Sequence, residues 1–176
     1  VTRPTVLAEG FPGGFSAIYP VFSHLEETGR IRRGYFVEGL GGSQFALPGA
    51  VDRLRSETRT GLVAMAAADP ANPYGSVLPW PDVEGIRLAR DAGAYVLLLD
   101  GKLVGYLDKG RRGLTLFDAT PERFGEISRA LAEVAGRHRR LTLVTVNGEP
   151  APATPLAAPL AEWGFATAPR GLTYRG

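Results

Sequence analysis

The sequence has no cysteine, and only two of its 176 residues are histidines. Without cysteine the chain can form neither a disulfide nor a thiolate metal site, and this composition favours an intracellular setting. The two histidines, His24 and His138, do not have the spacing of a zinc-binding motif. We therefore predict that the chain has no metal site.

Long hydrophobic runs are also missing. No apolar run approaches the roughly 20 residues that span a bilayer, so we predict no contact with membranes. Hydrophobic residues still make up 44% of the chain, which is enough to bury a core and argues against disorder. The length suits one domain or two small ones. Because the chain begins at Val1 without methionine, we expect it to be part of a longer protein.

Lysine is almost absent among the basic residues. Only Lys102 and Lys109 are lysines, and the other 18 of the 20 basic residues are arginines. Arginine is the side chain best suited to bidentate contact with phosphate. The same excess, together with abundant alanine, glycine and proline, is also expected from a GC-rich genome. The net charge of +2 does not decide between these explanations. The positions of the arginines along the chain have to decide.

The beginning of the chain shows the pattern of two helices separated by a break. Residues 5–9 suit one or two helical turns, and residues 10–14 interrupt them with three glycines and a proline. We expect Ser16 to cap the second helix, whose apolar residues between 18 and 25 recur with helical spacing. Gly29 stands where a glycine often ends a helix.

A β-hairpin is predicted to follow. Residues 30–37 are rich in β-forming side chains, glycines within 39–42 supply a flexible turn, and residues 43–47 suit a return strand. Pro48 ends that strand, and residues 50–56 suit a further helix. The order of helix, break, helix and hairpin predicts a winged helix-turn-helix, a module that sits on nucleic acid.

The predicted hairpin concentrates positive charge. In a winged helix these positions lie near the phosphate backbone, so we expect phosphate contacts by guanidinium groups and stacking by an aromatic ring. The candidate contacts are Arg30, Arg32, Arg33 and Tyr35, with Arg53 and Arg55 behind them. An alternative is that the charges only protect a solvated hairpin edge. Glu26 and Glu27 argue against insertion of the second helix into a groove, and a winged helix can also serve as a protein-contact module.

The rest of the chain mixes strand and helix patterns. A proline-rich loop occupies residues 69–81, and loops of this length are often functional. Asp100-Gly101 is a strong signal for a two-residue hairpin turn, and Asn147-Gly148 closes another strand. We expect strands at 94–99, 103–107, 114–117, 141–146 and 172–174, and helices that begin near Thr120 and Pro155.

The predicted fold class is α+β. Residues 1–57 are expected to form the N-terminal winged helix-turn-helix. Residues 58–176 are expected to form a small β-barrel-like module with one or two covering helices, because local hairpins favour an antiparallel sheet that closes or half-closes on itself.

Motifs for catalysis or nucleotide binding are missing. A phosphate-binding loop needs Gly-Lys followed by serine or threonine, whereas Gly101-Lys102 is followed by leucine. No serine lies in the Gly-x-Ser-x-Gly context of a hydrolase nucleophile. Asp69, Asp100 and Asp118 stand in loops or turns, where aspartate has routine capping roles. We therefore predict no catalytic residue and no cofactor site in this chain.

A family likeness is carried by residues 9–20, 29–41, 44–55, 69–75 and 78–81. These segments resemble the C-terminal region of the bacterial Lhr-type (large helicase-related) superfamily 2 helicases. The likeness runs from about residue 5 to the end of the chain, and it is dense up to Pro81. The resemblance implies a parent protein that moves 3′ to 5′ along single-stranded DNA by hydrolysing ATP and that acts in DNA repair.

The resemblance also implies where this chain belongs in such a protein. Residues 1 to about 57 correspond to the last winged helix, and a β-barrel follows. ATP and Mg²⁺ would be bound by motor domains that this chain lacks. The implied partners are DNA, either single-stranded or in an RNA:DNA hybrid, and the other winged-helix modules of the parent chain. A second copy of the chain is a further candidate partner, on the ground of the apolar residues 94–99. The implied location is the cytoplasm, in association with the nucleoid.

The same region of these helicases resembles the winged-helix DNA glycosylases of the AlkZ type. The Gln-x-Gln pair of those enzymes is missing, because Gln44 is the only glutamine here. Three hypotheses remain open. The chain binds nucleic acid without chemistry of its own, or it is part of a glycosylase for uracil or alkylated bases, or it is an oligomerisation and docking module. The apolar residues 94–99 and the proline-rich residues 151–159 favour the third.

Overall fold

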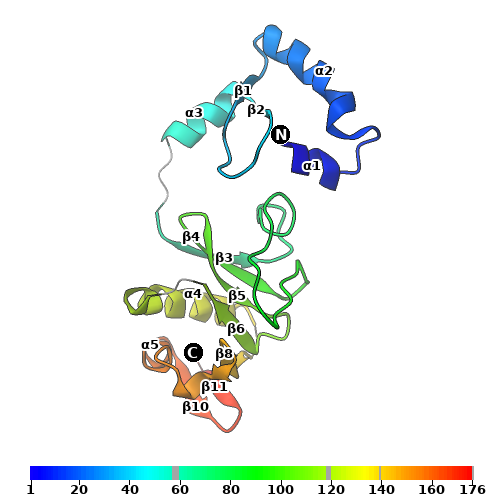
Figure 1. Ribbon diagram of the computed structural model, residues 1–176. Helices are drawn as coiled ribbons and strands as arrows, with labels where there is room; N and C mark the ends of the chain where they lie inside the picture. Colours follow the sequence, from blue (N-terminus) through cyan, green and yellow to red (C-terminus); the bar gives the residue numbers. More distant parts are fainter. Residues whose placement is uncertain (57–59, 118–119, 139, 176) are drawn as a thin grey trace. The chain divides into compact units, whose positions relative to one another are not determined.

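A computed structural model describes the chain over residues 1–56, 60–117, 120–138 and 140–175. The chain divides into two compact units (Figure 1). They consist of Val1–Arg59 with Pro73–Asp82, and of Thr60–Asn72 with Val83–Gly176. The predicted division at residue 57 stays a prediction.

The first unit combines helices with a β-hairpin. Its helices are α1 (Arg3–Ala8), α2 (Gly14–Glu27) and α3 (Pro48–Ser56). Its strands are β1 (Arg32–Gly34) and β2 (Gln44–Ala46), which pair antiparallel with Arg33 opposite Phe45. The predicted order of helix, break, helix, hairpin and helix is confirmed.

Two glycines with positive φ start α2. Gly13 has φ 78° and Gly14 has φ 60°, a conformation that costs little only for glycine. Gly13 is the N-cap and makes no side-chain capping hydrogen bond. The predicted N-cap, Ser16, lies within the first turn of the helix, so that prediction is wrong. The reason is that the left-handed glycine pair turns the chain into the helix before the serine is reached.

A glycine also ends α2. Gly29 has φ 72°, and its N–H donates to the carbonyl oxygen of Glu26 at 2.9 Å. The N–H of Arg30 donates to the carbonyl oxygen of Leu25 at 2.9 Å. These two bonds make the Schellman arrangement that satisfies the last carbonyl groups of a helix. The predicted role of Gly29 is confirmed.

Phe45 forms the centre of the first unit's core. Its side chain is 2% exposed, and three rings of α2 surround it. The ring centroids of Phe15, Tyr19 and Phe22 lie 6.4, 6.0 and 5.0 Å from that of Phe45. Aromatic pairs at such distances contribute about 0.5–1.5 kcal/mol each beyond the effect of burial. One aromatic cluster therefore holds α2 on the hairpin.

The second unit combines two sheets with helices. The longer strands are β3 (Leu62–Ala66), β4 (Tyr95–Leu99), β5 (Lys102–Leu107), β6 (Gly113–Leu116), β10 (Phe165–Ala168) and β11 (Gly171–Tyr174). The two-residue strands are β7 (Thr142–Leu143), β8 (Thr145–Val146) and β9 (Glu149–Pro150). The helices are α4 (Phe124–Gly136) and α5 (Ala157–Glu162), preceded by the 3₁₀ turns η1 (Pro121–Arg123) and η2 (Ala151–Ala153).

Hydrogen bonding joins these strands into a larger and a smaller sheet. The larger has the order β3-β4-β5-β6-β8-β9, and the smaller has the order β10-β11-β7. Neighbours are antiparallel except β6 and β8, which are parallel. The strands expected at 94–99, 103–107, 114–117 and 172–174 and both expected helices are confirmed. Strands β3, β9 and β10 were not predicted.

Both expected two-residue turns are present. Asp100 and Gly101 have φ 49° and 85°, and Asn147 and Gly148 have φ 50° and 85°. Positive φ at both central residues is the signature of the type I′ turn, whose twist matches that of the strands it connects. The Asp100 carboxylate also accepts the N–H of Gly61 at 2.7 Å. This bond ties the β4–β5 turn to the start of β3.

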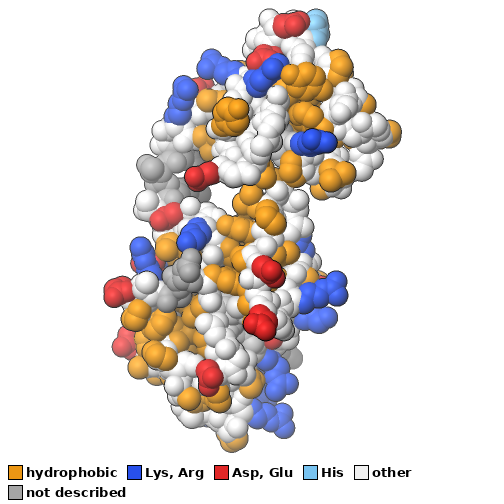
Figure 2. Space-filling model, viewed as in Figure 1, with side chains coloured by type: hydrophobic (Ala, Val, Ile, Leu, Met, Phe, Trp, Pro, Cys, Tyr) orange, Lys and Arg blue, Asp and Glu red, His pale blue; other side chains and the backbone are white. Residues whose placement is uncertain are grey.

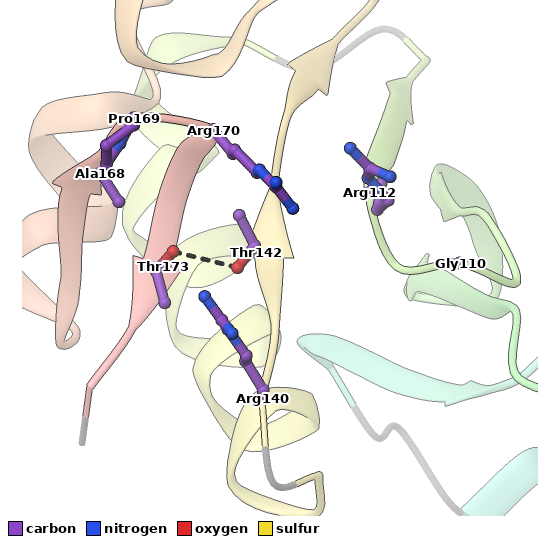
Figure 3. Close-up of a pocket in the computed structure, with 8 residues that line it drawn as sticks. All are labelled: Gly110, Arg112, Arg140, Thr142, Ala168, Pro169, Arg170 and Thr173. Carbon is purple, nitrogen blue, oxygen red and sulfur yellow. Dashed lines mark hydrogen bonds between the residues drawn. The ribbon is translucent and has the colours of Figure 1, made fainter.

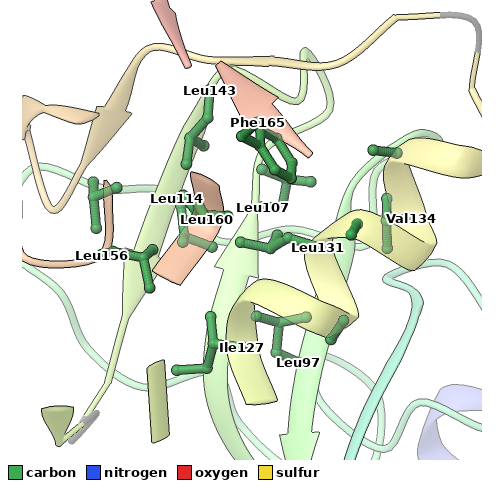
Figure 4. Packing of buried hydrophobic residues seen from close by; sticks show 14 of the residues in the cluster. Leu97, Leu107, Leu114, Ile127, Leu131, Val134, Leu143, Leu156, Leu160 and Phe165 are labelled. Carbon is green, nitrogen blue, oxygen red and sulfur yellow. The ribbon is translucent and has the colours of Figure 1, made fainter. Parts of the chain in front are cut away.

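The apolar face of α4 lies against the larger sheet (Figure 4). Ile127, Leu131 and Val134 on the helix are fully buried, together with Leu97 on β4 and Leu107 on β5. The spacing of the three helical residues places them on one face of a helix. This face is the one that the sequence pattern predicts.

The barrel-like arrangement is not confirmed, whereas the α+β class is. In the described residues both sheets are open, and the edge strands β3 and β9 are not paired with each other. The expected single strand at 141–146 is divided at Val144, so that β7 joins the smaller sheet and β8 the larger one. Because the chain crosses between sheets at this residue, the strands form two separate ladders and do not close a barrel.

Candidate nucleic-acid interface

The hairpin of the first unit is built around a buried glutamine. The side chain of Gln44 is 1% exposed and makes four hydrogen bonds with the loop between β1 and β2. Its carbonyl oxygen accepts the N–H groups of Phe36 and Val37, both at 2.9 Å. Its amide donates to the carbonyl oxygens of Val37 at 3.1 Å and Leu40 at 2.8 Å. The sequence analysis did not predict this role. The signal that could have indicated it is a single glutamine placed directly after a glycine-rich turn.

Arg33 is part of the hairpin's own structure. Its guanidinium forms an ion pair with Glu26 on α2 and lies over the rings of Tyr19 and Phe45, 5.5 and 5.4 Å from their centroids. Cation–π contacts of this kind contribute about 0.5–1 kcal/mol at exposed sites. The positive charge of Arg33 is therefore partly compensated within the unit.

The neighbouring arginine faces the other way. Arg32 precedes Arg33 on β1, and successive side chains of a strand point to opposite faces. Arg32 is exposed, as is Arg30 in the turn after α2. The structure therefore does not bring Arg32 and Arg33 to one face, although both lie on the hairpin as expected.

The side chain of Tyr35 is almost fully exposed, at 88%. It follows β1 and lines a groove of about 510 Å³ together with Glu26, Arg33 and Ser43. A freely exposed ring at the edge of a groove can stack on a nucleobase. The Glu26 carboxylate in the same groove disfavours phosphate there, so the phosphate contacts are expected outside it.

Arg53 and Arg55 lie on α3, and both are exposed. Residues two apart on a helix do not face each other, so the two side chains point in different directions. On the face shown in Figure 2, the basic side chains of the first unit are spread among hydrophobic and acidic ones. The exposed residues among the predicted nucleic-acid contacts are therefore distributed over the hairpin region and a helix.

The aspartates considered as candidates have turn roles where the structure describes them. The Asp69 carboxylate accepts the N–H of Ala71 at 2.8 Å, and that of Asp100 accepts the N–H of Gly61. Asp118 lies outside the described residues. Within the described ranges, no group of three His, Asp or Glu side chains could hold a metal ion, and no helix is long and apolar enough to cross a bilayer.

His138 follows the end of α4, as expected, and makes a contact that the sequence did not indicate. Its Nε2 is hydrogen-bonded to the hydroxyl of Tyr95 on β4 at 2.9 Å. Burial lowers the pKa of the imidazole, and the nearby charges of Arg111 and Arg137 lower this pKa further. The contact ties the helix end to the larger sheet.

Comparison with known proteins supports the architecture. Residues 1–64 match the winged-helix domain of the large helicase-related protein. A Mycolicibacterium smegmatis protein named Lhr helicase/probable uracil glycosylase is 46% identical over 159 residues, 84% of this chain and 11% of that protein. An Escherichia coli K12 protein named Lhr helicase/uracil glycosylase is 40% identical over 185 residues, 99% of this chain and 12% of that protein.

These matches show a class of domain and a family to which the chain is similar. The first unit is a winged-helix domain of the helicase-related class. Over most of its length the chain is similar to proteins of the Lhr (large helicase-related) family, as the resemblance of its sequence indicated. It spans 11% and 12% of the length of the two relatives, which is consistent with a C-terminal region of such a protein.

Proposed function

We propose that this chain is a nucleic-acid-binding region of an Lhr-type helicase, and that its hairpin contacts the phosphate backbone of DNA. The observation that carries the proposal is a set of exposed residues at a hairpin whose loop is held by buried Gln44: Arg30 just before the hairpin, and Arg32 and Tyr35 on it. Their unit matches a helicase winged-helix domain. A preorganised loop presents such side chains with little loss of conformational freedom on binding.

Each exposed residue has a distinct role in this proposal. Arg30 and Arg32 pair with phosphate oxygens, and Tyr35 stacks on a base. Arg33 shapes the hairpin and contacts DNA little, because its guanidinium is already paired with Glu26. ATP with Mg²⁺, and the 3′-to-5′ movement along single-stranded DNA that ATP hydrolysis drives, belong to motor domains of the longer protein.

The test is a salt series of binding to labelled single-stranded DNA. Each phosphate contact contributes about 0.7 to the slope of log K against log salt, so Arg30→Ala with Arg32→Ala should lower this slope by about 1.4. The matched control is Arg123→Ala with Arg129→Ala, which removes the same charge from arginines already paired with Glu126 and Glu133. A slope as low in the control as in the hairpin variant, or unchanged in both, would overturn the proposal.

Two further substitutions separate charge from stacking. Arg33→Ala is expected to leave the salt slope nearly unchanged, because that guanidinium is engaged within the unit. Tyr35→Ala is expected to weaken binding about 5-fold or more without changing the slope, because stacking is worth about 1–3 kcal/mol per base. A slope that falls with Arg33→Ala and not with Arg32→Ala would reverse the assignment of the two arginines.

A second proposal is that the chain takes part in removing uracil from DNA. It is favoured by the names of the two relatives, both of which include uracil glycosylase. The chain is incubated with a uracil-bearing oligonucleotide and the abasic product is cleaved with alkali. Cleavage that depends on uracil would support this function. The function would be excluded if neither the chain nor the longer protein that contains it cleaved the uracil-bearing oligonucleotide.

A further inference from the structure

A basic pocket in the second unit lies outside the hairpin interface. Three arginines from separate segments line it: Arg112 in the turn before β6, Arg140 before β7, and Arg170 in the β10–β11 turn. The pocket has a volume of about 430 Å³. In Figure 3 the side chains of Arg140 and Arg170 extend beside β7, and Arg112 lies across from them.

Backbone hydrogen bonds hold Arg112 in place. The Asp108 carboxylate accepts the N–H of Arg112 at 3.0 Å and that of Gly113 at 2.8 Å, which closes the turn between β5 and β6. The carbonyl oxygen of Arg112 accepts the N–H groups of Val144 at 2.7 Å and Thr145 at 3.1 Å. The main chain of Arg112 is thus fixed against the crossing between β7 and β8, while its side chain remains exposed.

A glycine brings the third arginine to the same place. Gly171 has φ 134°, and a Cβ atom there would lie 2.1 Å from the carbonyl oxygen of Leu143. Only glycine therefore allows β11 to approach β7 this closely, and Arg170 immediately precedes it. The hydroxyls of Thr142 and Thr173, on the same two strands, are 3.0 Å apart and line the pocket.

The charge of the pocket is unbalanced. Its lining contains three arginines and two threonines but no acidic residue. In the part of the chain that the structure describes, no carboxylate forms an ion pair with Arg112, Arg140 or Arg170. Elsewhere in the unit Arg123 and Arg129 each pair with a glutamate. Like charges gathered in a lining that holds no carboxylate favour the binding of an anion.

We infer that this pocket binds a phosphate group of a nucleic-acid strand, as a second contact separate from the hairpin. Guanidinium groups match phosphate oxygens in bidentate geometry, and threonine hydroxyls add further donors. Basic side chains also gather along one edge of the second unit on the face shown in Figure 2. Phosphate binding by this pocket is independent of the proposed function. Only the choice of nucleic acid as the phosphate-bearing ligand rests on that function.

The direct test follows the backbone amide signals of the full chain by NMR. Inorganic phosphate should shift the amide signals of Thr142, Arg170 and Thr173 in a saturable way, and Arg112→Ala with Arg170→Ala should abolish the shifts. The hairpin variant, Arg30→Ala with Arg32→Ala, should retain them. The hydrogen bonds that hold Arg112 are made by its backbone, so Arg112→Ala with Arg170→Ala, called the pocket variant, is expected to fold. An unchanged melting temperature would verify this.

The binding test uses oligonucleotides that differ only at the 5′ end. Loss of one phosphate contact in the pocket variant should lower the salt slope for single-stranded DNA by about 0.7. Tighter binding of the 5′-phosphorylated strand than of the 5′-hydroxyl strand assigns the pocket to a terminal phosphate, and equal binding assigns it to the backbone. Arg112→Lys with Arg170→Lys keeps the charge and should restore only part of the affinity, because lysine lacks the bidentate fork.

The outcomes separate this inference from the hairpin proposal. A fall in slope with the pocket variant alone supports the pocket and refutes the hairpin contacts. A fall with the hairpin variant alone, together with absent phosphate shifts, overturns the pocket. Saturable shifts caused by an acidic peptide and not by phosphate or DNA would overturn it as well, and would make the pocket a protein-docking site.

Discussion

The side chain of Gln44 holds the hairpin loop, and substitution of this residue tests how much it stabilises the first unit. Its four hydrogen bonds satisfy backbone groups of the loop that connects β1 and β2. Gln44→Ala would leave those groups without their partner, and each unsatisfied buried group costs about 1–3 kcal/mol. We expect a loss of about 2 kcal/mol or more in the free energy of unfolding of the first unit, measured by urea denaturation.

The matched variant for this prediction is Gln44→Glu. It keeps the oxygen that accepts the N–H groups of Phe36 and Val37 but lacks the amide that donates to Leu40. We therefore expect a loss of stability with either substitution. A change below about 0.5 kcal/mol for Gln44→Ala would be typical of a neutral surface position and would contradict the role given to this residue.

The folding stability of the chain is expected to depend on pH through His138. Burial and the charges of Arg111 and Arg137 lower its pKa below the usual 6.5. The unfolded chain therefore binds this proton more tightly than the folded one, so the contribution of His138 is complete above about pH 6.5 and declines as the pH falls below it. His138→Gln should reduce the decline, measured as the melting temperature between pH 7.5 and 5.0.

The control for this prediction is His24→Gln on the exposed surface of α2. It removes an imidazole from the first unit and so tests whether the loss of any histidine has the same effect. A decline between pH 6.5 and 5.0 of the same size in the His138→Gln variant as in the unchanged chain would show that other groups cause it.

At the scale of elements, the close approach of β11 to β7 depends on one glycine. A Cβ atom on Gly171 would lie 2.1 Å from the carbonyl oxygen of Leu143, and its φ of 134° is unfavourable for other residues. Gly171→Ala should therefore destabilise the second unit by about 2 kcal/mol or more, since strained backbone positions cost about 1–3 kcal/mol each. It should also weaken phosphate binding in the basic pocket, whose Arg170 and Thr173 flank the glycine.

The comparison for Gly171 is Gly125→Ala in the first turn of α4. A Cβ atom there meets nothing within 4 Å, and alanine favours a helix over glycine by about 0.5–1 kcal/mol. This variant should therefore be as stable as the unchanged chain or slightly more so in urea denaturation. Equal effects of the two substitutions would show that the position of Gly171 against Leu143 is not the cause.

At the scale of the whole molecule, each unit has a core of its own. Phe45 with three rings of α2 forms the first, and α4 on the larger sheet forms the second. Phe45→Ala removes the centre of the smaller core, and such substitutions cost about 3–5 kcal/mol. We expect faster hydrogen exchange in α2 and β2, with the protection of β4 and β5 retained.

The reciprocal variant for this prediction is Leu131→Ala in α4. It removes a fully buried side chain from the larger core and is expected to reduce the protection of β4 and β5 while that of α2 stays as it was. If either variant lowered protection equally in both units, the units would unfold as one cooperative body.

Much of the architecture could be predicted from local patterns. The turns at Asp100-Gly101 and Asn147-Gly148, the end of α2 at Gly29 and the buried face of α4 follow from rules that act over a few residues. Strand β3 was missed because its apolar residues have few local markers, and β9 because it has only two residues. Two of the four residues of β10 are alanines, which are uncommon in strands. The helix start at Gly13 was misplaced, because two glycines in the left-handed region start the helix without a side-chain cap.

The candidate site shows the same division. The sequence placed arginines and an aromatic residue on a hairpin, and the hairpin is present. It did not show that Arg33 pairs with Glu26 or that Gln44 holds the loop. The ion pair joins residues seven positions apart, and the Gln44 bonds reach four to eight positions back along the chain, so both depend on how the hairpin folds back on itself. Only the three-dimensional structure separates Arg33, which pairs with Glu26, from Arg30 and Arg32.

By itself the sequence determined the class of the first unit, the mixed α and β character of the rest and most of the turns, because these depend on short-range conformational preferences. Its recognisable segments also carried the likeness to a family. The tertiary structure alone decided that strand 141–146 divides between two sheets and that Arg112, Arg140 and Arg170 meet in one pocket. Those three arginines are far apart along the chain, and no local preference specifies which distant strands approach each other.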